Sequence, residues 1–294
     1  MASGGAASSS RGDDAAVRLY ERCDELLSRK ARGVPATRDE VAAIEPLMGA
    51  CRAVPRLRPS RPVRWHRRRP RARAASPAPP SSRPPSSLAR ALSDAVEARH
   101  VGLSPPAAND VSTSAPFAAR PCLQYVKLHD CPAFTMGVFA FPRGAAIPLH
   151  NHPGMTVMSK LLYGRLRVRS FDWVDGGVDY VGASAPVGVP RLARIVYDGA
   201  LAAPAAPFAL YPASGGNVHE FTALEPAAVM DVLSPPYAVG NGRDCHYFEE
   251  VAAGPGGEPA AEGFAWLAEI ECPDDFGVDR AENNANPKFG SEKE

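Results

Sequence analysis

The second half of the chain is a series of short apolar segments separated by turns, and this pattern predicts a mainly β fold. Gly164 separates the largely apolar segment Thr156–Tyr163 from Arg165–Phe171, which predicts a β-hairpin. In the second segment, arginines alternate with Leu166 and Val168, so one face points inward and the other outward. Many short strands joined by regular turns are typical of a closed barrel or jelly roll. The expected strands are Gln124–Leu128, Phe134–Phe141, Ile147–His150, Thr156–Tyr163, Arg165–Phe171, Arg194–Tyr197, Phe208–Tyr211, Val218–Thr222, Ala227–Leu233, His246–Glu250 and Phe264–Ile270.

Two helices are expected before the β region. Apolar residues recur at helical spacing from Asp13 to Lys30. The sequence Thr37-Arg38-Asp39-Glu40 is a capping box, in which the Thr hydroxyl and the Glu carboxylate each bond a backbone N–H at the start of a helix. We therefore predict a disordered Ala/Gly/Ser-rich tail over residues 1–12 and a helical segment over residues 13–50.

Residues 51–87 differ in composition from the rest, because Arg, Pro, Ser and Ala dominate them. This proline density prevents regular helix or sheet, and the segment cannot form a core. Two interpretations stay open: a disordered insertion, which includes a gene-model artefact, or a basic patch for nuclear localisation or nucleic-acid binding. Apart from Trp65 the insert lacks interleaved aromatics, which argues against specific nucleic-acid recognition. We expect the barrel domain, with its own N-terminal helix, over residues 88–275 and a polar tail over residues 276–294.

The overall composition is that of an ordinary globular protein. The 294 residues carry a net charge of +1, which argues against a strongly charged partner surface. No apolar run reaches the roughly 20 residues that a membrane span needs, and the N-terminus lacks the apolar core of a secretory signal. The six cysteines are widely spaced and form no CxxC pair, so we expect reduced thiols in the cytoplasm or nucleus.

His150 and His152 are separated by one residue at the end of an expected strand. In an extended strand, positions i and i+2 point to the same face, so this pair directs two imidazoles at one point. A third histidine, His219, follows a glycine-rich turn, and the segment from Pro153 to Tyr163 contains no Asp or Glu. We predict a three-histidine metal centre. Imidazole suits zinc, copper, nickel and iron alike, and three neutral ligands favour an anionic substrate group such as a thiolate.

Four other residues are candidates for the same site. Asp231 lies in an apolar segment, where a carboxylate is costly unless it is paired with a backbone group or Arg, or is functional. Tyr237 follows two prolines that form a rigid turn, so it either packs or holds its phenol over the site. Cys245 and Tyr247 share a face at i, i+2 and form either a buried pair or an interacting pair near the metal. Two histidines without a partner at suitable spacing are expected to be structural or at the surface: His129 and His246.

Several separated motifs, in a fixed order, resemble the plant cysteine oxidases, a group of thiol dioxygenases to which animal 2-aminoethanethiol dioxygenase is related. The resemblance covers about Val101 to Phe248, with a weaker similarity at Leu19–Cys23. The insert departs from the family, in which a short helical linker stands at this place. The matching runs are Ile147 to Val157, Leu162 to Gly164, Ser170 to Trp173, Tyr211-Pro212, Gly215 to His219, Asp231 to Tyr237 and Gly242 to Phe248.

The resemblance implies a cupin-type double-stranded β-helix, which is a jelly-roll barrel, with one non-haem Fe(II) held by His150, His152 and His219. It implies an Fe(II)-dependent dioxygenase that uses dioxygen to oxidise the N-terminal cysteine thiol of target proteins to cysteine sulfinic acid. In the plant enzymes the targets are notably group VII ethylene-response factors. The oxidation marks them for degradation by the N-degron pathway, so the enzyme senses oxygen in the hypoxia response.

The resemblance also implies roles for the remaining candidates. Asp231 matches an aspartate that engages the substrate, and Tyr237 matches a tyrosine that lines the site. Cys245 and Tyr247 match a pair that is cross-linked in the animal relative, and whether they are cross-linked here stays open. We expect a monomer in the cytoplasm and nucleus, without a membrane or a specific nucleic-acid partner. The alternatives are a cupin dioxygenase for a small free thiol such as cysteamine, or a non-catalytic metal-binding cupin.

Overall fold

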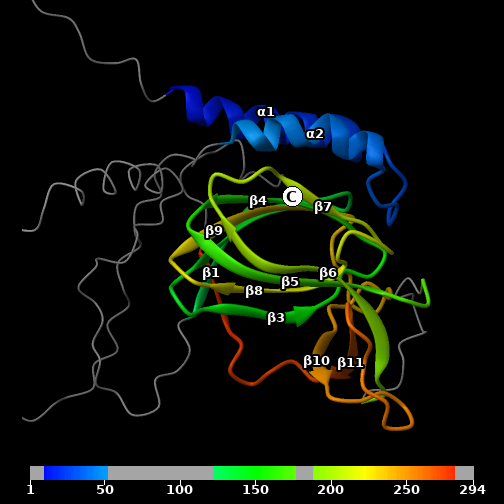
Figure 1. Cartoon of the computed structure of the whole chain (residues 1–294). Helices are drawn as coiled ribbons and strands as arrows, with labels where there is room; N and C mark the ends of the chain where they lie inside the picture. The colour runs from blue at the N-terminus through cyan, green and yellow to red at the C-terminus, as the bar shows by residue number, and fades with distance from the viewer. Residues whose placement is uncertain (1–9, 52–121, 177–187, 282–294) are drawn as a thin grey trace, which may run out of the picture.

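The structure is a computed structural model that describes residues 10–51, 122–176 and 188–281 (Figure 1). Helix α1 (Ser10–Leu27) and helix α2 (Arg38–Ala50) come first. The predicted capping box starts α2: the Thr37 hydroxyl accepts the Glu40 N–H, and the Glu40 carboxylate accepts the Thr37 N–H at 2.7 Å. The strands are β1 (Leu123–Asp130), β2 (Thr135–Phe141), β3 (Ala146–His150), β4 (Thr156–Tyr163), β5 (Arg165–Trp173), β6 (Arg191–Ala202), β7 (Phe208–Leu210), β8 (Val218–Ala223), β9 (Ala227–Ser234), β10 (Tyr247–Val251), β11 (Phe264–Ile270) and β12 (Val278–Ala281).

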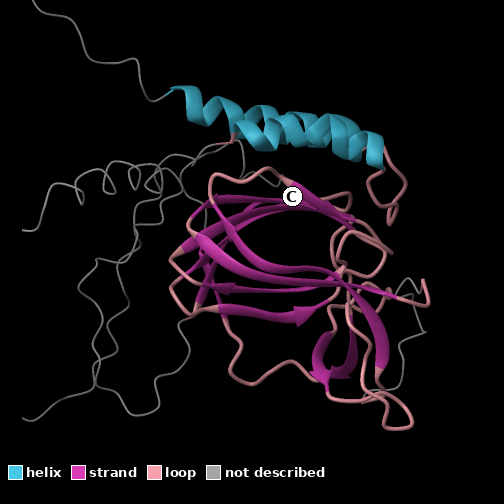
Figure 2. Cartoon of the chain, in the orientation of Figure 1, coloured by secondary structure: helices cyan, strands magenta, loops and turns pink. Residues whose placement is uncertain are grey.

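These strands form two sheets (Figure 2). One sheet has the order β12-β1-β2-β9-β4-β7, and the other, β10-β11-β6-β5-β8-β3, closes on itself. Gly164 does separate β4 from β5, but these strands do not pair: β4 pairs with β7 and β9 in one sheet, and β5 pairs with β6 and β8 in the other. The predicted β-hairpin is therefore wrong, because the turn at Gly164 carries the chain from one sheet to the other. The outward arginines of β5 alternate with buried residues as expected. The prediction of a mainly β, cupin-type jelly roll with N-terminal helices is confirmed.

The two helices lie side by side against the outer face of the first sheet (Figure 1). Met230 and Val232 of β9 pack with the helices, whereas Asp231 between them faces the interior of the molecule. This follows from the period of two along a strand. Strand β9 is therefore covered on both faces, and its fully apolar neighbours make the single carboxylate conspicuous.

The structure corrects and limits several expectations at the ends of the chain. Strand β12 lies inside the predicted polar tail of residues 276–294, so that prediction is wrong for residues 278–281. These residues form a strand because they pair in parallel with β1, where Leu123 lies opposite Val278. This pairing joins distant parts of the sequence. Helix α1 begins at Ser10, slightly before the predicted start of the helical segment. The Arg/Pro-rich insert beyond residue 51, and the helix expected after residue 88, lie outside the described residues, and the domain bounds stay a prediction.

Two observations bear on the environment of the chain. Within the described ranges, no helix combines the length and the apolar character that crossing a membrane requires. The six cysteines all lie in these ranges as free thiols.

The turn between β4 and β5 gives a first testable prediction. Gly164 has a φ of +83°, and a Cβ added to it would lie 2.1 Å from the Pro226 carbonyl oxygen, a backbone atom that cannot move aside easily. We expect Gly164→Ala to lower the free energy of unfolding by about 3 kcal/mol or more. Gly256 is the matched control, because its φ is +97° but nothing lies within 4 Å of an added Cβ. Gly256→Ala should cost only about 1 kcal/mol, and equal losses in urea unfolding of the two variants would contradict the steric argument.

Candidate metal centre

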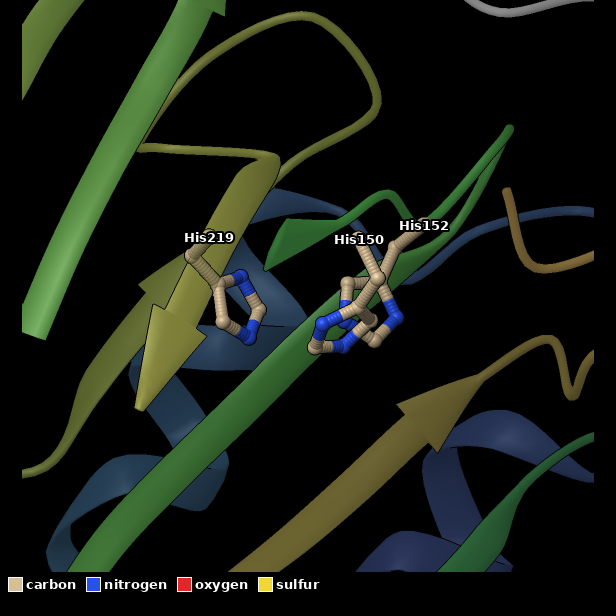
Figure 3. A group of neighbouring side chains, drawn as sticks. All are labelled: His150, His152 and His219. Carbon is tan, nitrogen blue, oxygen red and sulfur yellow. The ribbon is translucent and has the colours of Figure 1, made fainter. Parts of the chain in front are cut away.

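His150, His152 and His219 form one buried group (Figure 3). His150 ends β3, and strand pairing places it opposite His219 of β8. The centroids of the three imidazole rings lie 4.7 to 5.0 Å from one another. One ring nitrogen of each histidine lies within 4.8 Å of those of the other two. The structure thus brings together the three residues that the sequence proposed as metal ligands.

The local backbone at His152 differs from the sequence-based prediction. Strand β3 ends at His150, so His152 lies in the following loop and not in the same extended strand. The Asn217 side chain fixes this loop from the opposite side. Its Oδ1 accepts the His152 N–H at 3.0 Å, and its Nδ2 donates to the His152 carbonyl oxygen at 3.0 Å. The ring of His152 therefore takes its position from a tertiary hydrogen-bond pair and not from strand periodicity.

Asp172 holds the turn that precedes His219. Its buried carboxylate accepts the backbone N–H groups of Gly215 at 3.1 Å, Gly216 at 2.8 Å and Asn217 at 3.2 Å. Gly216 has a φ of +85°, and an added Cβ would lie 2.6 Å from the side chain of Ser170. Sequence reasoning gave Asp172 and Asn217 no role. The signal that could have identified Asp172 was its place next to buried aromatic residues, because a carboxylate buried there needs several hydrogen-bond donors.

In two of the three histidines, a hydrogen bond identifies the ring nitrogen that is free to bind a metal. His150 Nδ1 lies 2.8 Å from the Pro148 carbonyl oxygen, and His219 Nδ1 lies 3.3 Å from that of Gly216. A carbonyl oxygen only accepts, so each Nδ1 carries the hydrogen and Nε2 keeps its lone pair. Burial lowers the pKa of His150 to about 4 and holds the pKa values of His152 and His219 well below the ordinary value. All three rings are therefore neutral at physiological pH, which is the form that binds metals.

This donor set fits a transition metal. Three neutral imidazoles suit iron, zinc, copper or nickel, and they are a poor match for magnesium or calcium, which prefer oxygen ligands. Within the described ranges, the group consists of the three histidines alone, and no carboxylate or thiol belongs to it. The site is thus suited to a non-haem metal ion whose charge the protein does not neutralise.

Asp231 lies on the inner face of β9, between Gly137 of β2 and Ser159 of β4 in the strand register. Its carboxyl group accepts the Ser159 hydroxyl at 2.6 Å and is 8% exposed. Burial raises the pKa of Asp231 to about 7, although the hydrogen bond from Ser159 opposes the shift. The sequence analysis named a backbone group or an arginine as the partner of a structural Asp231. In the structure the partner is the Ser159 hydroxyl.

Tyr237 contacts the histidine group directly. Its hydroxyl donates to the Asn151 carbonyl oxygen at 2.7 Å and lies 2.7 Å from His152 Nδ1. Burial holds the pKa of Tyr237 well above its ordinary value, so the phenol keeps its proton. The predicted phenol beside the site is therefore present, and it orients His152.

Cys245 and Tyr247 lie in the wall of the same pocket, as their shared face suggested. The Cys245 thiol is within hydrogen-bonding reach of the hydroxyls of Tyr237 and Tyr247. Burial raises the pKa of Cys245 to about 11, so the thiol is neutral. The structure brings this pair together next to Tyr237, which itself contacts a histidine of the group.

The other two described histidines have structural contacts. His129 lies between the rings of Tyr20 and Phe134, with centroid distances of 4.9 and 4.7 Å, and so joins α1 to the sheet. His246 Nδ1 lies 2.8 Å from the Glu269 carboxylate. Both agree with the structural role expected from their isolated positions in the sequence.

The histidine group opens into a pocket of about 880 Å³. Both sheets contribute to its wall, and Asp231 and Ser159 lie in it with the three histidines. Apolar side chains form much of the remaining lining: Phe139, Ile147, Val157, Phe221, Leu233 and Phe276. A polar centre inside an apolar pocket of this volume is typical of a small-molecule or peptide site.

Comparison with known proteins finds several relatives of this chain. The chain is 42% identical over 160 residues to plant cysteine oxidase 1 of Arabidopsis thaliana, covering 51% of this chain and 53% of that protein. It is 37% identical over 199 residues to plant cysteine oxidase 2 of the same plant, covering 65% and 69%. It is 34% identical over 179 residues to human 2-aminoethanethiol dioxygenase, covering 53% and 64%. The matched part is thus about half the length of the first of these relatives.

A family model covers more of the chain than the pairwise matches to these relatives. The PCO_ADO model matches residues 92–289, a range that includes all the strands and the whole histidine group. The chain therefore belongs to the PCO_ADO family.

Proposed function

We propose that this protein is an Fe(II)-dependent dioxygenase for the N-terminal cysteine of target proteins. The reaction joins one thiol and one molecule of dioxygen to give one cysteine sulfinic acid, so both oxygen atoms enter the product. We further propose that it serves oxygen sensing in the hypoxia response, acting in the cytoplasm and nucleus on group VII ethylene-response factors marked for the N-degron pathway. The names of the plant relatives support the reaction class.

The observation that carries this proposal is the all-histidine donor set at a deep pocket. His150, His152 and His219 would hold the iron, and a bound ferrous ion supplies the redox chemistry that dioxygen and a thiol need. Because the three rings are neutral, the protein leaves the positive charge of the ion for an anionic group of the substrate. A thiolate is such a group, and its pKa falls beside a metal cation.

The surrounding residues bind and orient the substrate. The Asp231 carboxyl faces the pocket, and a substrate ammonium group beside it would favour the ionised form. The hydroxyl of Tyr237 keeps the ring of His152 in place through the contact at 2.7 Å. The apolar side chains in the wall lower the local dielectric constant, which strengthens the attraction between the carboxylate and the ammonium group.

The pocket volume favours a peptide over a small thiol. About 880 Å³ lies near the upper end of the usual range for ligand pockets, so a cysteamine molecule would leave most of it unfilled. Cysteamine is still the second candidate substrate, because one relative is named 2-aminoethanethiol dioxygenase. A non-catalytic metal-binding cupin is the third reading, and it predicts metal binding without oxidation of any thiol.

The test is aerobic incubation of iron-loaded protein with a peptide that begins with cysteine, followed by mass spectrometry. We expect a gain of about 32 Da at the N-terminal residue, the mass of the two oxygen atoms in a sulfinic acid. An N-acetylated copy of the peptide is the control, because it keeps the thiol but lacks the ammonium group for Asp231. Faster oxidation of cysteamine than of the peptide would favour the second candidate. Oxidation of neither thiol by iron-loaded protein would refute both dioxygenase readings.

A further inference from the structure

A second pocket of about 590 Å³ adjoins the metal pocket. The two pockets share Asp130, Pro236 and Tyr237 in their walls. Tyr237 connects them closely, because its hydroxyl contacts His152 while the residue also lines the second pocket. The other walls come from the loop between α1 and α2, the turn after β1 and the loop that follows Tyr237.

Two arginines give this second pocket its charge. Arg32 comes from the loop between the helices and Arg243 from the loop after β9. Within the described ranges neither forms an ion pair. The one carboxylate in the wall, that of Asp130, is already engaged by the Lys127 ammonium at 3.1 Å and the Thr135 hydroxyl at 2.9 Å. The pocket therefore presents two guanidinium groups, and its one carboxylate already pairs with a lysine.

The guanidinium of Arg243 is held in place for binding. Its Nε donates to the Pro236 carbonyl oxygen at 3.1 Å, and its Nη1 lies next to Gly33, 3.2 Å from where a Cβ would be. The side chain is half-buried. One of its five N–H donors is used in this way, and the planar group keeps donors for a carboxylate.

We infer that the second pocket binds an acidic side chain of the substrate polypeptide, a few residues after its N-terminal cysteine. The inference rests on the proposed function, because it needs the first residue of the substrate at the histidines, and the shared lining residues Asp130, Pro236 and Tyr237 place the second pocket directly beside that site. A carboxylate is the side chain that two guanidinium groups recognise, with paired N–H···O bonds. Arg32 and Arg243 would thus determine which sequences are accepted, apart from the N-terminal cysteine itself.

The test measures binding and oxidation separately. Amidated peptides begin with cysteine and carry Glu, Gln or Lys at one position, which is moved along an otherwise uncharged chain. Binding to the full iron-loaded chain is measured without oxygen by fluorescence anisotropy, and oxidation is measured with oxygen by mass spectrometry. At the best position we expect the Glu peptide to bind about threefold to tenfold more tightly than the Gln peptide. This preference should shrink as salt is added.

A charge reversal supplies a signal that misfolding cannot imitate. Arg32 is exposed and its side chain forms no hydrogen bond or ion pair within the described ranges, so Arg32→Glu should fold normally. It should abolish the preference for Glu and make the Lys peptide bind more tightly than it binds to the unchanged protein. Arg165 is also exposed but lies outside both pockets, so Arg165→Glu is the matched control and should keep the preference for Glu.

The possible results separate this inference from the proposed function. Oxidation of all peptides with equal binding of Glu, Gln and Lys at every position would overturn the inference and leave the oxidase intact. A clear preference for Glu without any sulfinic acid would support the acidic-residue pocket and overturn the oxidase. If no peptide binds and none is oxidised, both are wrong.

Discussion

Replacing His219 with alanine should remove the bound metal and the activity together. His219 supplies one of three nitrogen donors in a group that, within the described ranges, has no other ligand to take its place. We expect the affinity for Fe(II) to fall at least about 100-fold, more than the usual effect of changing an outer-shell partner. Metal analysis of anaerobically purified protein and the oxidation of a cysteine-initiated peptide provide the two measurements.

The control for this variant is a histidine outside the group. His246 contacts Glu269 and not the other histidines, so His246→Gln should keep its full metal content. Circular dichroism shows whether each variant is folded. A folded His219→Ala protein with unchanged iron and unchanged turnover would remove His219 from the metal site.

Asp231→Asn should have the second largest effect, with a loss of activity of about 10-fold to 100-fold on a cysteine-initiated peptide. The amide keeps the shape of the carboxyl group and can still accept the Ser159 hydroxyl, but it cannot pair with an ammonium group. The loss should be much smaller for the N-acetylated peptide, if that peptide reacts measurably. Asp198→Asn is the control, since Asp198 pairs with arginines at the surface of β5 and β6. Equal turnover by Asp231→Asn and the unchanged protein would exclude substrate recognition by Asp231.

The same variant predicts a pH dependence of stability. Between about pH 4 and pH 7, metal-free folded protein keeps a proton on Asp231 that the unfolded chain has released, because burial raises the pKa to about 7. This contribution to stability is complete below the ordinary pKa and is lost as the pH rises through the folded value, by about 1.4 kcal/mol for each pH unit at most. Asp231→Asn lacks the titration, so its stability relative to the unchanged protein should rise with pH over this window and then level off. A constant difference in urea unfolding across the window would contradict the raised pKa.

Local patterns in the sequence were sufficient for most of the strands. The alternation in Arg165–Phe171 and the capping box at Thr37 each depend on neighbours within a few residues, and the structure confirms both. The hairpin expected around Gly164 is wrong, because pairing partners far along the chain place β4 and β5 in different sheets. Strand β12 was not predictable in this way, because its short polar sequence becomes a strand through pairing with β1.

The candidate site shows the same difference between local sequence patterns and contacts between distant segments. Residue type and spacing were enough to select the three histidines. The positions of the rings, however, depend on contacts between distant segments, such as the Asn217 amide on the backbone of His152 and the Asp172 carboxylate on the turn before His219. No spacing rule encodes these contacts, since they exist only once β5 and β8 have paired.

Strand β9 connects the helices to the site in a way that has a genetic consequence. Met230, Asp231 and Val232 point alternately to the helices, to the pocket and to the helices again. A codon deleted or inserted within this strand, upstream of Asp231, would slip the register by one and exchange the two faces. The carboxylate would then be pressed against the helix pair while a thioether or valine methyls entered the pocket, so a single in-frame indel would damage folding and chemistry at once.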